Sequence, residues 1–138
     1  MRCNRCGKLI KPEDIGKYAP GIVWKTMNGG TSWNEISGDL PSIPLKCIAI
    51  SRDPSLQNPL IFVGGDPGVF VSNEILGGVT GQVVHWTKYG IGLPEVKIMD
   101  MEIRQGTLPQ YITVGTLGRG VYTADISGLE IPSLNAPA

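Results

Sequence analysis

One stretch of sequence occurs twice in this chain, and the repeat limits the folds that the chain can adopt. Residues 33–41 align without a gap on residues 86–94, which lie 53 positions further on, and both copies begin with Trp and end with Leu-Pro. The same register continues as far as Ile50 and Ile103. A repeat that keeps its order at a fixed spacing indicates structural units that are built alike and pack on one another.

Two shorter patterns extend the repeat to parts of three units. A valine followed by an aromatic residue occurs three times, at Val23-Trp24, Val69-Phe70 and Val121-Tyr122. Ahead of the last two copies, Val63-Gly64-Gly65 matches Val114-Gly115-Thr116.

The residues between these landmarks predict short β-strands. From residue 21 onward no ten-residue segment has the apolar spacing of an amphipathic helix. Nineteen Gly and eleven Pro divide the chain into short β-rich runs. The runs are Ile22–Thr26, Ser32–Ile36, Leu45–Ser51, Leu60–Gly64, Gly68–Ser72, Val83–Lys88, Val96–Ile103, Tyr111–Gly115 and Val121–Ile126.

Together, the strands and the repeat predict an all-β fold made of four-stranded antiparallel blades of the β-propeller type. The chain supplies the last two strands of one blade, all four of the next and the first three of a third. We therefore expect about two blades over residues 21–128, which form an incomplete ring.

Two motifs in this region resemble the Asp-box (BNR) propellers, which include sialidase-like proteins, xyloglucanase-type glycoside hydrolases and the sortilin-like VPS10 group. The Asp-box pattern is Ser/Thr-x-Asp-x-Gly-x-Thr/Ser-Trp. A segment of this chain is similar to the pattern, with Asn in place of Asp: Thr26-Met27-Asn28-Gly29-Gly30-Thr31-Ser32-Trp33. The segment from Gly115 to Ile126, with its Gly118-Arg119-Gly120 core, resembles the end of the final blade in such proteins.

The chemistry of the box predicts a structural role. Gly30 can take the positive φ that the turn demands. The side chains of Asn28 and Thr26 can close the turn by hydrogen bonds to nearby backbone N–H groups, and Ser32 completes the box. Trp33 is expected to anchor the turn by filling space between blades.

Arg119 lies between Gly118 and Gly120, a sequence that favours a tight turn. The resemblance places this turn near the propeller axis. We expect its guanidinium to clamp backbone carbonyls, with contact to a ligand as the alternative.

The first twenty residues form a separate N-terminal extension with a C-x-x-C pair. Cys3 and Cys6 have the spacing of a zinc knuckle, but a closed zinc site needs four ligands. The remaining candidates, Cys47 and His85, are isolated in the sequence. Zinc bound with ligands from a second chain and ordinary reduced surface thiols both stay open. At the other end, residues 129–138 are expected to form an extended tail that can lie along a neighbour.

No catalytic motif is evident, so we expect a protein that is not an enzyme. Paired carboxylates carry glycoside hydrolysis, and the one notable pair is Asp100 and Glu102, which an ordinary strand places on one face. A solvated strand face is the favoured explanation of that pair. His85 has no Ser, Cys or Asp nearby in a triad-like context and reads as a strand residue.

The composition of the chain argues against some classes of partner. Twelve basic and twelve acidic residues balance, which argues against a nucleic-acid partner. No apolar run approaches the ~20 residues that span a bilayer. The first six residues lack the apolar core of a secretory signal, although the resembled families are often extracellular, so the compartment stays open.

The leading hypothesis is a non-catalytic propeller module that assembles with, or recognises, a protein or glycan. Because a little over two blades leave strand edges open, we expect a homo-oligomer or a larger propeller chain to complete the ring. The alternatives are a fragment or subunit of a propeller glycoside hydrolase with its catalytic acids elsewhere, and a zinc-knuckle protein that binds nucleic acid.

Overall fold

The structure is a computed structural model that describes residues 21–52, 59–73, 84–106, 109–127 and 129. Within these ranges all regular structure is β, as the sequence predicts, and there is no helix. The strands are β1 (Trp24–Lys25), β2 (Asn34–Glu35), β3 (Leu45–Ser51), β4 (Leu60–Gly65), β5 (Gly68–Ser72), β6 (Thr87–Tyr89), β7 (Ile98–Ile103), β8 (Tyr111–Thr116) and β9 (Val121–Asp125).

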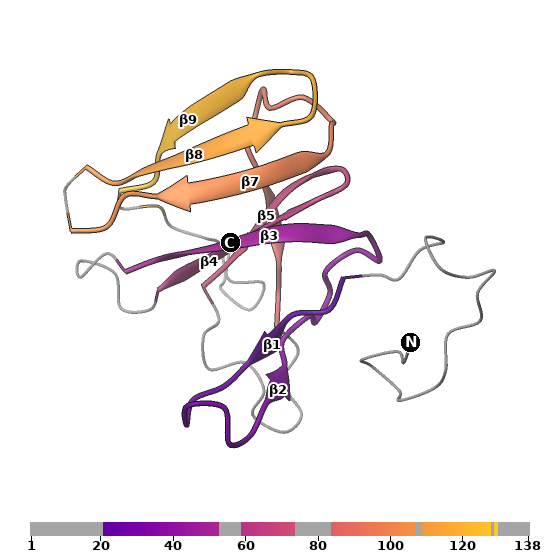
Figure 1. Cartoon of the computed structure of the whole chain (residues 1–138), viewed down its shortest axis with the longest axis vertical. Helices are drawn as coiled ribbons and strands as arrows, with labels where there is room; N and C mark the ends of the chain where they lie inside the picture. The colour runs from indigo at the N-terminus through magenta and orange to yellow at the C-terminus, as the bar shows by residue number, and fades with distance from the viewer. Residues whose placement is uncertain (1–20, 53–58, 74–83, 107–108, 128, 130–138) are drawn as a thin grey trace, which may run out of the picture.

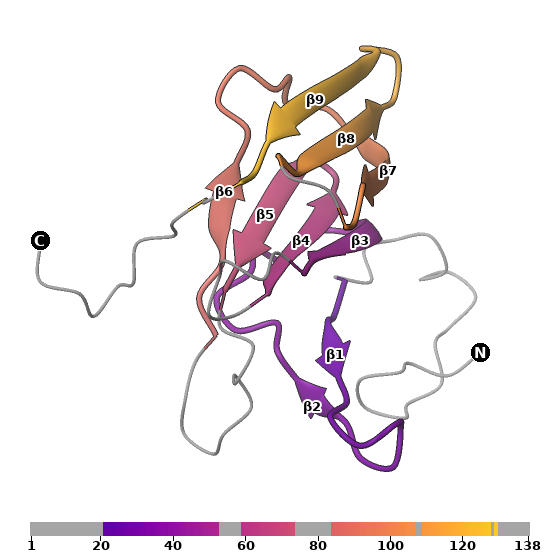
Figure 2. The same ribbon diagram turned by 90° about the vertical axis from the view of Figure 1, so that its left-hand side faces the viewer.

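These strands form three antiparallel sheets that follow one another along the chain (Figure 1). Sheet 1 contains β1 and β2, sheet 2 contains β3, β4, β5 and β6 in sequence order, and sheet 3 contains β7, β8 and β9. Figure 2 shows β4 and β5 of sheet 2 lying between the β1–β2 hairpin and sheet 3. The number of strands in each sheet matches the predicted division into two, four and three.

Most strand bounds lie within two residues of the prediction, but β6 begins four residues later than expected. The reason is a pair of tertiary hydrogen bonds. The Trp86 N–H donates to Asp39 Oδ1 at 2.7 Å, and the Asp39 N–H donates to the carbonyl of Val84 at 3.1 Å. The backbone before Thr87 is thus bonded to the loop after β2.

The repeat is visible in the backbone of sheets 2 and 3. In the pairing of β3 with β4, the register shifts between Leu45 and Cys47. In the pairing of β7 with β8, it shifts between Ile98 and Asp100, 53 positions further on. Such an irregularity redirects the strand. Its recurrence at matching positions shows that the two units are built alike.

The turns that lead into β3 and β7 also agree. Before β3, the Leu40 N–H donates to the carbonyl of Ser37 at 2.8 Å. Before β7, the Leu93 N–H donates to the carbonyl of Gly90 at 2.9 Å. Hereafter, residues that occupy the same place in two units are called equivalent.

Two apolar layers hold the sheets together. All six residues of β4 are buried, so its continuous apolar run is covered on both faces. Between sheets 2 and 3 lie mainly Ala49, Leu60, Phe62, Val69, Val71, Ile98, Met101, Ile103, Ile112, Val114 and Ile126. Between sheets 1 and 2 lie Val23, Ile36, Ile61, Val63, Phe70, Val84 and Trp86.

A buried polar contact crosses the layer between sheets 2 and 3. Gln110, just before β8, is almost fully buried. Its Oε1 accepts a hydrogen bond from Ser51 Oγ at the end of β3, and its N–H donates to Ser127 Oγ at 2.6 Å. Burying these polar groups is tolerated because each finds a partner.

The predicted N-terminal extension and most of the predicted tail lie outside the described residues. Leu129 is described, and it packs partly against the layer between sheets 2 and 3. In the described part of the chain, no helix is long and apolar enough to cross a membrane.

Candidate functional site

Side chains close the turn between β1 and β2, as predicted. Thr26 Oγ1 accepts the Gly30 N–H at 2.8 Å, and Asn28 Oδ1 accepts the Ser32 N–H at 2.9 Å. Asn28 Nδ2 donates to Ser32 Oγ at 2.8 Å, and Thr26 Oγ1 donates to Asn28 Oδ1 at 3.0 Å. Gly30 has a φ of 98°, the left-handed region that favours glycine. Both polar ends of the Asn28 amide are thus engaged inside the turn.

The role expected of Trp33 is not seen within the described residues. Its side chain is 55% exposed, so it fills no space between units in this structure. Trp86, the equivalent residue, is 8% exposed and packs in the layer between sheets 1 and 2. The difference arises because Trp86 has a preceding sheet to pack against, whereas no described sheet precedes sheet 1.

The turn from β8 to β9 has the expected backbone. Gly118 and Gly120 have φ angles of 78° and 84°, and the Thr116 N–H donates to the carbonyl of Gly120 at 3.1 Å. The guanidinium clamp expected of Arg119 is not seen in the described part of the chain. Its side chain is exposed, and among the described residues its guanidinium has no hydrogen-bond or ion-pair partner. The two glycines close this turn together with Thr116, whose Oγ1 also donates to the Gly120 carbonyl at 2.6 Å.

Cys3 and Cys6 lie outside the described residues. In the described ranges, no three His, Cys, Asp or Glu side chains gather as metal ligands would. The Nδ1 of His85 lies 3.1 Å from Asp39 Oδ2. Cys47 is half-buried on β3, and its pKa is raised, first by burial of the thiol and then by the Asp100 carboxylate.

Asp100 and Glu102 lie on one face of β7, as predicted, and both are exposed, with buried Met101 between them. That face is the outer one of sheet 3, and it is more polar than its counterpart. Buried Phe62 of sheet 2 corresponds to exposed Thr113, and buried Ala49 corresponds to Glu102. The pair is therefore part of a solvated strand face.

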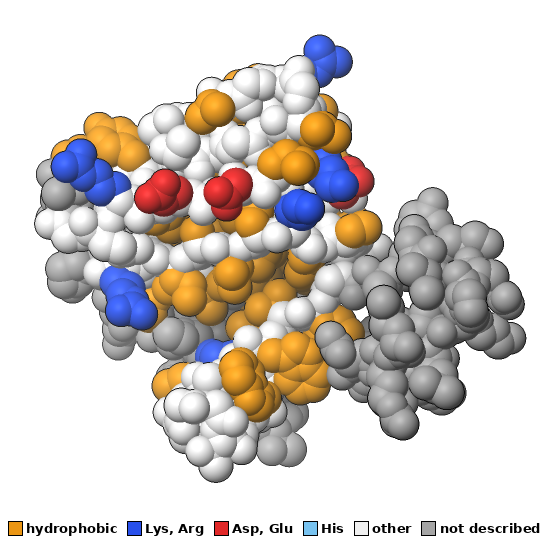
Figure 3. Space-filling model, viewed as in Figure 1, with side chains coloured by type: hydrophobic (Ala, Val, Ile, Leu, Met, Phe, Trp, Pro, Cys, Tyr) orange, Lys and Arg blue, Asp and Glu red, His pale blue; other side chains and the backbone are white. Residues whose placement is uncertain are grey.

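An apolar hollow lies on the opposite side of the stack, between β3 and the β1–β2 hairpin (Figure 3). Ile48 and Ile50 of β3 are 52% and 40% exposed. Their equivalents on β7 are Met101 and Ile103, which sheet 2 covers and which are 6% and 8% exposed. The hollow is open because sheet 1 has no described strand beyond β1 to cover this part of β3.

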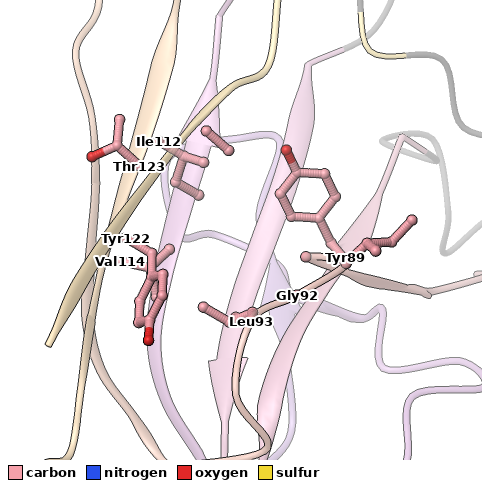
Figure 4. A pocket seen from close by; sticks show the side chains of 10 residues that line it. Tyr89, Gly92, Leu93, Ile112, Val114, Tyr122 and Thr123 are labelled. Atoms are coloured by element: carbon pink, nitrogen blue, oxygen red, sulfur yellow. The ribbon is translucent and has the colours of Figure 1, made fainter. Parts of the chain in front are cut away.

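A second opening is an apolar groove of about 180 Å³ between the loop that follows β6 and the inner face of β8 and β9. Side chains from both sides border it (Figure 4). It is lined by Tyr89, Gly90, Ile91, Gly92, Leu93, Ile112, Val114, Tyr122, Thr123 and Ala124. The Tyr89 hydroxyl has a raised pKa, first because of burial and then because of the Asp125 carboxylate, so Asp125 acts on this groove.

No protein family, curated protein or solved structure matches this chain. The hollow and the groove are thus known only from the chain's own geometry. Sequence reasoning predicted open strand edges but located neither opening. The alignment of the repeat contains the signal, because Ile48 and Ile50 match residues that a preceding unit buries.

Proposed function

We propose that this chain is a non-catalytic binding module of the Asp-box β-propeller type, which works by accepting β-strands from a partner. The observation that carries the proposal is the exposure of Ile48 and Ile50 where Met101 and Ile103, their equivalents, are buried. Sheet 1 has two described strands where sheet 2 has four. Two further strands paired on the edge of β1 that faces away from β2 would cover the hollow.

The energetic reason is the apolar surface of the hollow. Burying an isoleucine side chain contributes roughly 1.5–3 kcal/mol. The edge of β1 that faces away from β2 has no described strand paired to it. Its backbone groups can be matched in register only by another extended chain. These two features favour a protein partner, either a second copy of the chain or a larger propeller chain, over a glycan.

The architecture favours assembly at one end of the stack of sheets. The outer face of sheet 3 carries Thr113, Asp100 and Glu102 where sheet 2 is apolar or holds the Cys47 thiol, so that end of the stack is suited to water. In stacked repeats, a terminal unit with a polar outer face caps the array. Assembly is therefore expected at the sheet 1 end.

The test is the size of the protein in solution. Light scattering and sedimentation of the full chain are expected to show an oligomer whose population rises with concentration. Ile48→Lys combined with Ile50→Lys is expected to shift the population at least tenfold toward monomer, because two charges would be buried in the interface. Leu117→Lys, at an exposed turn residue away from the hollow, is the matched control and should leave the oligomer intact.

A stable, well-folded monomer at all concentrations, with no partner needed, would overturn the proposal. The hydrolase alternative predicts a different result, namely release of sugar from a panel of β-glucans. Asp100 and Glu102 lie on the exposed face of β7 rather than in a cleft, so the described residues offer no observation in favour of hydrolysis.

A further inference from the structure

The groove beside β9 is equivalent to the place that Trp86 fills one unit earlier. Trp86 packs in the layer that contains Ile36, Ile61, Val63 and Phe70, with Leu40 partly buried against it. The equivalents of these five residues are Tyr89, Ile112, Val114, Tyr122 and Leu93, and all five line the groove. The middle unit thus shows that a groove with this lining accommodates a tryptophan side chain.

The size of the groove agrees with this comparison. Its volume is about 180 Å³, and an apolar cavity of about 150 Å³ is enough to bind benzene. The indole of Trp86 also donates from Nε1 to the carbonyl of Ile36 at 2.9 Å. In the groove, the equivalent carbonyl is that of Tyr89, and a carbonyl oxygen has two lone pairs to offer.

Beside the groove, the outer edge of β9 has no described strand paired to it, whereas β5, its equivalent, is paired with β6. Two hydrogen bonds fix the phase of the β8–β9 ladder: the Thr116 N–H donates to Gly120 O, and the Ile126 N–H donates to Gln110 O. Antiparallel pairs alternate between bonded and non-bonded. The backbone N–H and C=O groups of Val121, Thr123 and Asp125 therefore point away from β8.

The negative charge of Asp125 indicates which kind of residue the bound strand carries opposite it. Asp125 lies at the end of β9, and its carboxylate already raises the pKa of Tyr89, after the effect of burial. In sheet 2, Val71 of β5 pairs with Thr87 of β6. If a strand paired with β9 in the same register, the residue before its tryptophan would lie opposite Asp125. Opposite charges across strands are favourable. A basic residue before the tryptophan fits best, and His85 is in that place in sheet 2.

We infer that β9 and the groove together bind a β-strand of a partner protein that carries a basic residue followed by tryptophan. The strand pairs antiparallel to β9 and makes sheet 3 four-stranded like sheet 2. Its indole enters the groove between Leu93, Tyr122 and Val114. This site differs from the hollow at sheet 1 and can be occupied whether or not the hollow is filled.

One difference from the middle unit lowers the expected affinity. In the middle unit, Asp39 accepts the N–H of Trp86 at 2.7 Å. The equivalent of Asp39 beside the groove is Gly92, which has no side chain to accept that N–H. A single short strand in this groove is therefore expected to bind weakly, in the range of about 0.1–1 mM, which corresponds to 4–5.5 kcal/mol.

The probe is a synthetic peptide with the sequence of residues 83–89, blocked at both ends, added to the full chain. Binding is followed by nuclear magnetic resonance, and amide exchange is measured residue by residue. The amides of Val121, Thr123 and Asp125 should become protected. Those of Tyr122 and Ala124, which already face β8, should change little. The same peptide with alanine in place of tryptophan should bind at least tenfold more weakly.

Thr123→Pro provides a matched test on the protein side. Its N–H faces away from β8, so proline removes a donor needed by the added strand while leaving the β8–β9 ladder in place. Thr123→Val keeps the N–H and is the control. Binding is expected to be lost in the first variant and retained in the second, with both variants melting near the wild-type temperature.

Equal binding of the tryptophan and alanine peptides, or protection of Val69 and Val71 in place of the β9 amides, would overturn the inference. So would unchanged binding to the folded Thr123→Pro variant. Because the inference shares the idea of strand acceptance with the proposed function, the Ile48→Lys, Ile50→Lys variant separates them: peptide binding at β9 should persist in it while oligomers are lost.

Discussion

The indole Nε1 of Trp86 donates a hydrogen bond of 2.9 Å to the carbonyl oxygen of Ile36, fifty residues earlier in the chain. Ile36 follows β2 in sheet 1, and Trp86 precedes β6 in sheet 2. Both residues are buried in the layer between these sheets. A specific polar bond inside an apolar layer fixes how one unit sits on the next.

Replacing Trp86 with alanine is expected to destabilise the protein by about 3–5 kcal/mol, because a large buried side chain leaves a cavity. Trp86→Phe retains much of the apolar volume but leaves the Ile36 carbonyl without its donor, at a cost of about 1–3 kcal/mol. Trp33→Ala, at the exposed equivalent position, should cost less than about 1 kcal/mol. Urea unfolding measures all three, and equal losses for Trp86→Ala and Trp33→Ala would contradict the packing described here.

The turn between β1 and β2 gives a second prediction. Gly30→Val should lower stability by about 1–3 kcal/mol, because a β-branched residue is strained at a φ of 98°. Asn28→Asp should cost less than about 0.5 kcal/mol, since a carboxylate oxygen can still accept the Ser32 N–H. Thermal melts of the two variants provide the measurement. A Gly30→Val protein that melts like the wild type would refute the turn assignment.

The polar contact between Ser51 and Gln110 predicts non-additive mutations. Gln110→Leu leaves the fully buried Ser51 hydroxyl without this acceptor and should cost about 1–3 kcal/mol. Adding Ser51→Ala should recover part of that loss, giving a coupling of about 0.5–3 kcal/mol in a double-mutant cycle. Leu117→Ala, at an exposed turn residue, is the control and should show no coupling to Ser51→Ala. A coupling near zero would mean that the buried bond contributes no specificity.

Local sequence predicted the bounds of strands that are set by neighbouring residues. It failed for the strand whose start is set by a tertiary contact. The bounds of β3 and β5 were predicted to the residue, because apolar β-rich runs there end at turn residues. The start of β6 was not, because the backbone of Trp86 bonds to the side chain of Asp39, 47 residues away. Spacing alone does not reveal such a contact.

The candidate sites divide in the same way. The Thr26, Asn28 and Gly30 turn could be read from sequence because each of its hydrogen bonds joins residues no more than four positions apart. The exposure of Trp33 could not, since the repeat gives it the same sequence position as buried Trp86 and only the neighbouring sheet distinguishes them. The hollow and the groove likewise depend on neighbouring strands, because no described strand lies over Ile48 or pairs with the outer edge of β9.

The thiol of Cys47 gives a prediction about pH. Its pKa lies above the ordinary value of 9.0, because burial disfavours the thiolate and the Asp100 carboxylate repels it, while a Gly64 backbone hydrogen bond and Lys46 act in the opposite sense. A folded pKa above the unfolded one means that the stabilising contribution is complete below the unfolded pKa and is lost as pH rises through the folded pKa. Stability is therefore expected to fall from about pH 9 upward.

Asp100→Asn isolates the electrostatic part of this effect. The asparagine keeps an oxygen that can accept the Met101 N–H, which donates to Asp100 Oδ1 at 2.9 Å, but it removes the negative charge. The pKa of Cys47 should fall, so alkylation of Cys47 by iodoacetamide, followed by mass spectrometry of its peptide, should reach half-maximal rate at a lower pH. Glu102→Gln, the neighbouring acid on the same face, is the control and should leave the alkylation profile where it is. A profile that moves with Glu102→Gln and not with Asp100→Asn would show that the Asp100 carboxylate is not the charge that raises the pKa of this thiol.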